Sequence, residues 1–170
     1  VSVDWVTENW CEEKPITRTK RKISVTKSEN YHTLSIDECA FKVPRHWFWD
    51  EFSDDWEPQT YNFFQRNLQK GKTYLDIGGW VGPTAFIATS LGANKVKIVE
   101  PNPVNFFHLL SSQFNNGLLA KWFLINACIA DQTGDKVIGP INGIQSGSSA
   151  TNIRDQNQEG ARIISLKLSD

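Results

Sequence analysis

The sequence predicts an α/β protein built on a parallel sheet, and three observations support this fold class. From about residue 60 onward, short apolar segments typical of buried strands alternate with segments of helical periodicity. Their order is strand, helix, strand, helix, strand, which is the order that a parallel sheet with crossover helices requires. A glycine-rich turn joins the first of these strands to the next helix. We therefore expect a domain over residues 61–170, preceded by an irregular or β-rich extension over residues 1–60 that packs on it.

The extension contains three short segments with strand character. Residues 23–26 and 33–36 flank a polar turn, and residues 41–43 form the third. Aromatic side chains follow them, and we expect these to pack the extension onto the core, although an acceptor pocket or a partner surface are alternatives. They are Trp47, Phe48, Trp49, Phe52 and Trp56.

The elements of the main domain are marked by proline, asparagine and glycine. A helix is predicted over residues 55–68, with Phe63, Phe64 and Leu68 on one apolar face. Further helices are predicted after Pro83 and after Asn102, because proline suits the first helical position and asparagine the N-cap. Strands are predicted at residues 73–77, 96–99, 122–125 (extended by 129–130), 136–138 and 162–168, with a loop over residues 139–160.

Composition excludes several classes of function. A net charge of −1 provides no overall field that attracts nucleic acid or an anionic membrane, so we expect neither as a partner. No run of about 18 apolar residues is present, so we expect no membrane span. The three scattered cysteines lack zinc spacing, which favours reduced thiols in a cytoplasmic protein and no metal site. The basic cluster at residues 18–22 is expected to be a solvated face rather than a phosphate contact.

The glycine turn carries the chemistry of the predicted site. A turn of this kind after a parallel strand lets a ligand approach the backbone closely and directs the free N–H groups of the next helix toward it. A dinucleotide site has the pattern Gly-x-Gly-x-x-Gly, but here Ile77 occupies the first glycine position, before Gly79 and Gly82. The strand instead ends with the pattern Asp76-x-Gly78-Gly79, in which Ile77 separates the acid from the glycines.

Two carboxylates distinguish the ligand. Asp76 would repel a pyrophosphate but suits the ammonium group of a methionine moiety. Glu100 ends the next strand, 21 residues after Gly79, where an acid accepts hydrogen bonds from ribose hydroxyls. Together they favour S-adenosylmethionine as the cofactor. The alternatives are an NAD-type site, or a doubly wound protein in which Asp76 only caps a helix.

These motifs resemble the FkbM-type class I methyltransferases. The resemblance rests on YLDIGGWVG at residues 74–82, VEPNP at residues 99–103 and NACIAD at residues 126–131. WEPQT at residues 56–60 and the SGSS segment at residues 146–149 extend it over about residues 55–170. Trp80 departs from the small or amide residue often found at its position, and this affects the shape of the pocket.

The resemblance implies a partial Rossmann-like sheet, S-adenosylmethionine as cofactor, and a hydroxyl oxygen of a sugar or small natural product as methyl acceptor. Asp76, Gly78 and Gly79 would then hold the methionyl part and Glu100 the ribose. Asn102 or Asn126 would reach the adenine side, and Glu57 would border the methionyl end. The protein would act mainly by positioning the acceptor against the methyl group, helped by a base.

Two further expectations concern catalysis. His46, beside the aromatic cluster, is the best histidine for a general base, although a structural role is the alternative. His108 is expected on an exposed helix face. The family continues into further strands that complete the acceptor pocket, whereas this sequence starts at Val1 and stops at Asp170. We therefore expect a cofactor-binding part, with a catalytically inactive fragment or a non-enzymatic binding module as the alternative.

Overall fold

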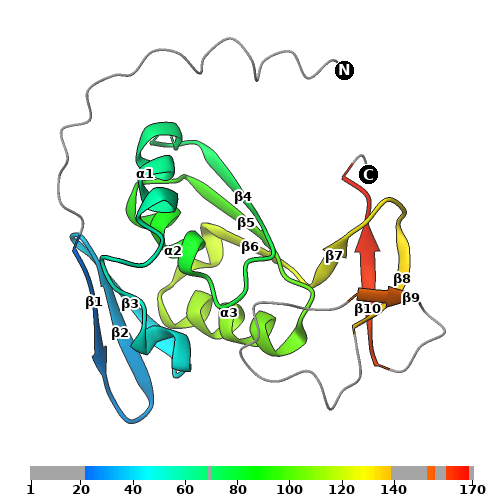
Figure 1. The fold of residues 1–170 in the computed structure, drawn as a ribbon, viewed down its shortest axis with the longest axis horizontal. Coiled ribbons are helices and arrows are strands. Elements are labelled where there is room, and N and C mark those ends of the chain that lie inside the picture. Colours follow the sequence, from blue (N-terminus) through cyan, green and yellow to red (C-terminus); the bar gives the residue numbers. More distant parts are fainter. Residues whose placement is uncertain (1–21, 69, 139–152, 156–159, 169–170) are drawn as a thin grey trace.

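The computed structural model describes residues 22–68, 70–138, 153–155 and 160–168 (Figure 1). It begins with an antiparallel sheet of three strands, β1 (Ile23–Lys27), β2 (Tyr31–Ile36) and β3 (Cys39–Pro44), in that order. Leu34 lies opposite Val25 on one side and Phe41 on the other. Alternate residues of β2 are buried, as expected for a strand with one face on the core.

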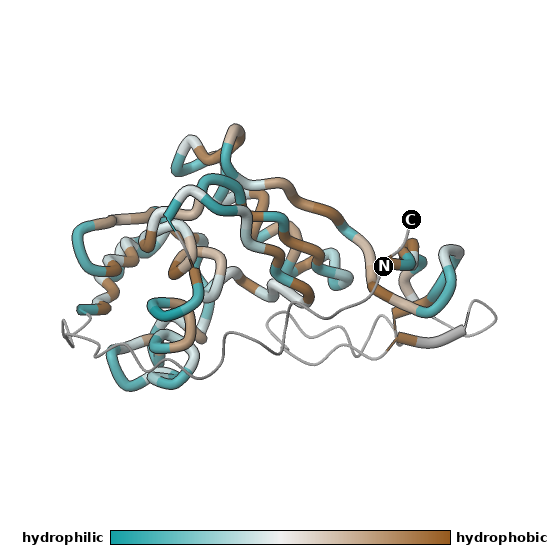
Figure 2. The backbone as a smooth tube through the Cα atoms, turned by 90° about the horizontal axis from the view of Figure 1, so that it is seen from above, coloured by the Kyte–Doolittle hydropathy of each residue, from teal (hydrophilic) through white to brown (hydrophobic). Residues whose placement is uncertain are grey.

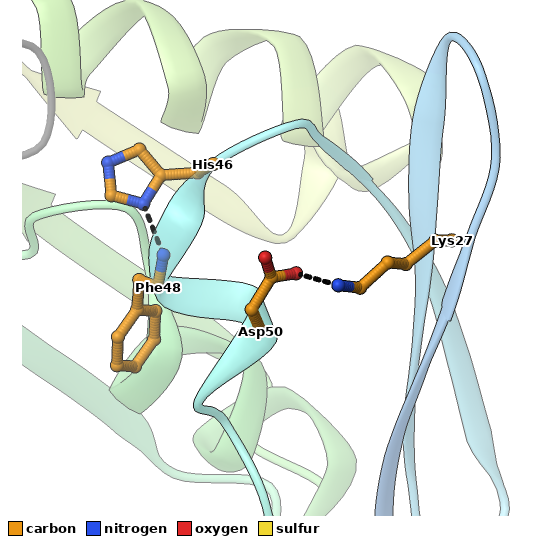
Figure 3. A network of polar contacts seen from close by, with 4 residues as sticks. All are labelled: Lys27, His46, Phe48 and Asp50. Carbon is orange, nitrogen blue, oxygen red and sulfur yellow. Dashed lines mark hydrogen bonds and ion pairs between the residues drawn. The ribbon is translucent and has the colours of Figure 1, made fainter.

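A single 3₁₀ turn, η2 (Trp47–Asp50), follows the antiparallel sheet and carries the aromatic cluster. Phe48, Trp49 and Phe52 are almost fully buried. An ion pair of 2.7 Å between Lys27 and Asp50 joins η2 to the end of β1 (Figure 3). Phe48, Trp49 and Phe52 belong to the same hydrophobic core as Phe86 and Trp122.

The centre of the molecule is a parallel sheet in the order β4–β5–β6, formed by β4 (Thr73–Ile77), β5 (Lys95–Val99) and β6 (Trp122–Ile125). The helices α2 (Pro83–Ser90) and α3 (Pro103–Asn115) connect successive strands, and α1 (Pro58–Asn67) precedes them. The three helices lie on the same side of the sheet (Figure 1). The chain therefore has the predicted α/β class, with a partial Rossmann-like sheet.

One hydrophobic core lies between this sheet, its helices and the antiparallel sheet. Its largest fully buried side chains come from all three layers and include Leu34, Phe86 and Trp122. Phe86 packs against Phe41 of the extension and against Trp122 of β6, with ring centres 4.9 Å apart in both pairs. Helix α2 is apolar on most of its surface and is accordingly buried nearly all round.

The last described part forms a third sheet, of four strands in the order β7–β10–β8–β9. Its strands are β7 (Ala127–Ile129), β8 (Gly134–Ile138), β9 (Ile153–Asp155) and β10 (Ala161–Leu166), and its core consists of Cys128, Ile138 and Ile163. Figure 1 shows it beside the carboxyl end of β6, away from the helices.

The predicted elements agree with the structure except at a few boundaries. Residues 127–129 do not extend β6: they form β7, which pairs with β10 in the other sheet. Part of the predicted loop over residues 139–160 is strand β9, and residues 139–152 and 156–159 lie outside the described residues. Helix α1 starts at Pro58, three residues later than predicted. Phe63 is 53% exposed, so it does not share the buried face with Phe64.

In the parts of the chain that the structure describes, no helix is long and apolar enough to cross a membrane. Cys39 and Cys128 are free thiols, and Cys11 and the basic residues at positions 18–21 lie outside the described residues.

Candidate functional site

The glycine turn between β4 and α2 has an unusual backbone that is bonded to the end of β5. Gly78, Trp80 and Gly82 all have positive φ angles, of 82°, 50° and 98°. The N–H groups of Gly78 and Gly79 both donate to the Val99 carbonyl oxygen, at 2.8 and 3.2 Å. The turn is therefore fixed across the carboxyl ends of two neighbouring strands, at the edge where α/β proteins bind ligands.

The first two glycines of the turn serve different purposes. A Cβ atom on Gly79 would overlap the Cγ2 methyl group of Ile98, so only glycine lets the turn lie flat on β5. A Cβ atom on Gly78 would meet no heavy atom within 4 Å, and the left-handed φ of this residue disfavours any side chain. An open patch of backbone is thus left at Gly78, which a ligand can approach closely.

Asp76 lies on the inner side of β4, directly before the turn, and is 7% exposed. Its Oδ2 atom accepts a hydrogen bond of 2.7 Å from the Thr84 hydroxyl in the first turn of α2. The Tyr74 hydroxyl donates to Oδ1 at the longer distance of 3.4 Å. Burial raises the pKa of Asp76 above its usual value, although both hydrogen bonds act in the opposite direction.

Glu100 follows the last residue of β5 and is 3% exposed. Its Oε2 atom accepts from the Trp80 backbone N–H at 2.7 Å. Its Oε1 atom accepts from the Asn102 N–H at 2.8 Å and from the Asn105 side chain at 3.4 Å. Burial raises the pKa of Glu100 despite these donors. The carboxyl group thus joins the glycine turn to the start of α3.

The two asparagines of the predicted adenine side both have structural bonds. Asn102 is buried and is the N-cap of α3, where its Oδ1 accepts from the Val104 N–H at 2.9 Å. The Asn126 amide, just after β6, donates to the carbonyl oxygens of Glu100 and Pro101 at 2.8 and 3.3 Å. Both residues therefore lie at the same end of the sheet as Glu100 and hold its chain segment in place.

Glu57 lies apart from this network. It is the residue before α1, has a left-handed φ of 38°, and is exposed. Its carboxylate accepts a hydrogen bond of 2.8 Å from the Thr60 hydroxyl. The structure gives Glu57 a role at the start of α1, and none of its described hydrogen bonds reaches Asp76 or Glu100.

His46 is the N-cap of η2, where its Nδ1 atom accepts from the Phe48 N–H at 3.2 Å (Figure 3). The ring is 9% exposed and packs against Trp80 of the glycine turn, with ring centres 5.6 Å apart. It also packs edge-on against His108 of α3, at 5.2 Å. Burial, with the neighbouring His108, lowers the pKa of His46 to about 4. The expectation that His108 is exposed is wrong, because η2 covers that part of α3.

This arrangement decides what His46 does. Because Nδ1 accepts a hydrogen bond, the neutral ring carries its proton on Nε2. The Nε2 nitrogen points away from η2 in Figure 3. In this state Nε2 carries the proton and does not take another, and it is buried with no hydrogen-bond partner among the described residues. The geometry therefore favours a structural role for His46 over that of a general base.

The sequence did not reveal three contributors to the site: Thr84, the Trp80 backbone N–H, and Asn105. Thr84 lies in the first turn of a predicted helix that starts beside Asp76, and this position was the available signal. The other two depend on how α3 and the turn meet. Within the described ranges, no group of three or more His, Cys, Asp or Glu side chains is placed to hold a metal ion.

Comparisons with known proteins identify no family. No family model matches the chain, and no curated protein matches it. Among solved structures it is similar to a SAM-dependent methyltransferase from Agrobacterium tumefaciens, at 15% identity and a TM-score of 0.42 over 61% of this chain. It is also similar to aTrm5 in complex with tRNALeu, at 18% identity and a TM-score of 0.39 over 63% of this chain. A third similar structure is a tRNA methyltransferase of M. jannaschii, with 18% identity and a TM-score of 0.37 over 67% of this chain.

The chain spans about a third of the length of these structures, which are covered to 34%, 28% and 35%. They correct one expectation, namely that a nucleic-acid partner is excluded: one of the three is a tRNA methyltransferase, and another is bound to tRNA. The physical reason is that a net charge of −1 describes the whole chain and says nothing of the charge on one face.

Proposed function

We propose that the chain binds S-adenosylmethionine at the glycine turn and is the cofactor-binding part of a methyltransferase. The observation that carries this proposal is the placement of two buried carboxyl groups, Asp76 and Glu100, on either side of the turn. They end neighbouring parallel strands, and Gly78 leaves an open backbone surface beside them. Residues 61–170 would carry this site, and residues 1–60 would support it.

The residues present fit this cofactor. Among the residues that the structure describes, two hydroxyl groups donate to Asp76. A carboxylate accepts about four hydrogen bonds, so Asp76 retains capacity for an ammonium group. The three described donors to Glu100 leave it about one further hydrogen bond, enough for a ribose hydroxyl. A pyrophosphate, in contrast, would meet the negative charge of Asp76, which disfavours NAD.

The bound cofactor would supply an electrophilic methyl group on a sulfonium, so this chain's residues need only bind, orient and exclude water. Asp76 would fix the amino-acid end, and Gly78 and Gly79 would let it approach the backbone. Glu100 would fix the ribose, and Asn102 and Asn126 would keep the adenine side in shape. Gly82, the N-cap residue of α2, would belong to the cofactor-binding turn. The exposed Glu57 would form a more distant border of the site.

The resemblance to FkbM-type enzymes supports a hydroxyl oxygen as the methyl acceptor. In that case His46 would support the site by packing against Trp80 of the glycine turn rather than remove a proton, because its Nε2 atom is enclosed by protein. Transfer of a radiolabelled methyl group to a sugar, a small natural product and a tRNA, tested separately, distinguishes the acceptor classes. Retained cofactor binding without transfer to any of them would favour a binding module over an enzyme.

The test of the site is isothermal titration with S-adenosylhomocysteine. We expect Asp76→Asn to weaken binding roughly tenfold to a hundredfold, because a charge-assisted hydrogen bond is lost. The matched control is Asp131→Asn, which makes the same change at an exposed turn and should bind like the unmodified chain. Equal affinity of both variants would contradict the assignment of Asp76.

A further inference from the structure

Trp80 has a backbone conformation that is costly for its side chain. It lies in the glycine turn with a positive φ of 50°, in the left-handed region that a bulky residue rarely adopts. Gly78 and Gly82 of the same turn adopt a positive φ without such a cost. The hydrophobic stretches of β4 and β5, which this turn bridges, are visible as brown tube in the centre of Figure 2. A strained residue persists only where the surrounding structure holds it, so the contacts of Trp80 decide what it does.

The indole ring of Trp80 packs against three consecutive residues around the start of η2. Its ring centre lies 4.4 Å from that of Phe48, 5.6 Å from that of His46 and 5.9 Å from that of Trp47. Phe48 is 3% exposed and belongs to the hydrophobic core, so it is a fixed support rather than a loose surface contact. The extension therefore reaches the glycine turn through the side chain of Trp80.

The backbone of the same residue orients Glu100. The Trp80 N–H donates to Oε2 of Glu100 at 2.7 Å, while Oε1 accepts from the Asn102 N–H at 2.8 Å. Because one oxygen is bonded to the turn and the other to the start of α3, the carboxyl group is prevented from rotating, and its remaining lone pair points in a fixed direction. A hydrogen bond to a ribose hydroxyl depends on that direction, since hydrogen bonds weaken steeply when they are misaligned.

We propose that Trp80 is a positioning residue that sets the ribose selectivity of the cofactor site through Glu100. The packing of its indole ring on η2 keeps the turn in the left-handed conformation, and this conformation directs the Trp80 N–H toward Oε2 of Glu100. The identity of the ligand rests on the proposed function, whereas the link from the indole ring to the carboxyl group is a property of the unliganded chain. Through this link η2 acquires a defined effect on cofactor binding.

The test compares Trp80→Gly with Trp56→Gly. Glycine adopts the left-handed conformation freely but is not held in it, so Trp80→Gly removes the support without blocking the turn. Trp56 is a matched control, because it is a half-buried tryptophan that packs against Phe48 and Phe52 and lies outside the turn. Trp80→Phe keeps an aromatic ring against Phe48 and should restore the behaviour of the unmodified chain.

The first measurement is calorimetric titration with S-adenosylhomocysteine and with its analogue that lacks both ribose hydroxyls. The unmodified chain, Trp56→Gly and Trp80→Phe should bind S-adenosylhomocysteine roughly tenfold or more tightly than the analogue. Trp80→Gly should bind the two ligands within about threefold of each other. A merely structural loss would weaken both ligands equally, so an unchanged ratio in Trp80→Gly would overturn the proposal.

The second measurement needs no ligand. Hydrogen exchange of the residue 80 amide, followed by NMR and compared with its intrinsic rate, should be roughly tenfold or more faster in Trp80→Gly, because the N–H is no longer kept on Glu100. Equal protection of this amide in Trp80→Gly and the unmodified chain would overturn the link between Trp80 and Glu100 alone. Absence of S-adenosylhomocysteine binding by the unmodified chain would instead overturn the proposed function, and the ribose role with it.

Discussion

Glu100→Gln and Asp76→Asn are the same chemical change at two buried carboxyl groups, and the structure predicts opposite effects on stability. Both acids have a pKa raised by burial. They differ in their partners. Glu100 accepts from two backbone N–H groups, one on each oxygen, whereas Asp76 accepts only from hydroxyl groups. A hydroxyl can rotate to accept a hydrogen bond from an amide, but a backbone N–H cannot.

The magnitude follows from these partners. In Glu100→Gln the side-chain NH₂ must face at least one backbone N–H, such as that of Trp80, which leaves a largely buried donor unsatisfied and costs about 1–3 kcal/mol. For a chain of this size, that lowers Tm by roughly 2–12 °C. In Asp76→Asn the amide keeps the Thr84 hydrogen bond and removes the cost of burying a charge.

The pH dependence of Asp76→Asn has a definite sign. Because the folded-state pKa of Asp76 is raised, its protonated form stabilises the fold at low pH, and this contribution is lost as pH rises above the ordinary value of 3.8. Asp76→Asn should therefore match the unmodified chain in acid and equal or exceed its stability at pH 7. Urea unfolding followed by tryptophan fluorescence measures both variants. A Glu100→Gln variant at least as stable as Asp76→Asn at pH 7 would refute the reasoning.

Three further predictions concern packing and ionisation. Gly79→Ala should destabilise the fold by about 1–3 kcal/mol through overlap with its neighbour on β5, while Gly134→Ala, which has open space, should be nearly neutral in the same urea assay. The imidazole signals of His46 should titrate near pH 4 by NMR. Because the unfolded chain takes up the proton more readily, the free energy of unfolding should fall as pH drops from about 6.5 toward 4. An NMR titration midpoint above pH 6 would contradict the burial of this ring. Thr89→Val should cost about 1–3 kcal/mol, because the buried Trp122 indole N–H loses its acceptor, yet leave cofactor affinity unchanged.

The helix starts and the convergence of the two acids were predictable because local rules fix them. Pro83 and Asn102 set the helix starts through their backbone and capping preferences. Asp76 and Glu100 end adjacent parallel strands, and the carboxyl ends of such strands meet at one edge of the sheet. The sequence pattern was therefore enough to place the two acids at one edge of the sheet.

Other features depend on tertiary packing and have no local signal. His108 has ordinary helical surroundings in the sequence and is covered only because η2 folds back onto α3. The break between β6 and β7 occurs at Asn126, whose side chain bonds across to the end of β5. Apolar periodicity cannot distinguish one strand that continues from two strands that join different sheets.

The most direct test of the central claim is calorimetric titration of the chain with S-adenosylhomocysteine and, separately, with NADH. The account predicts one S-adenosylhomocysteine bound per chain and no heat from NADH, because Asp76 attracts an ammonium group and repels a pyrophosphate. Binding of NADH, or no binding of S-adenosylhomocysteine by the folded chain, would contradict it.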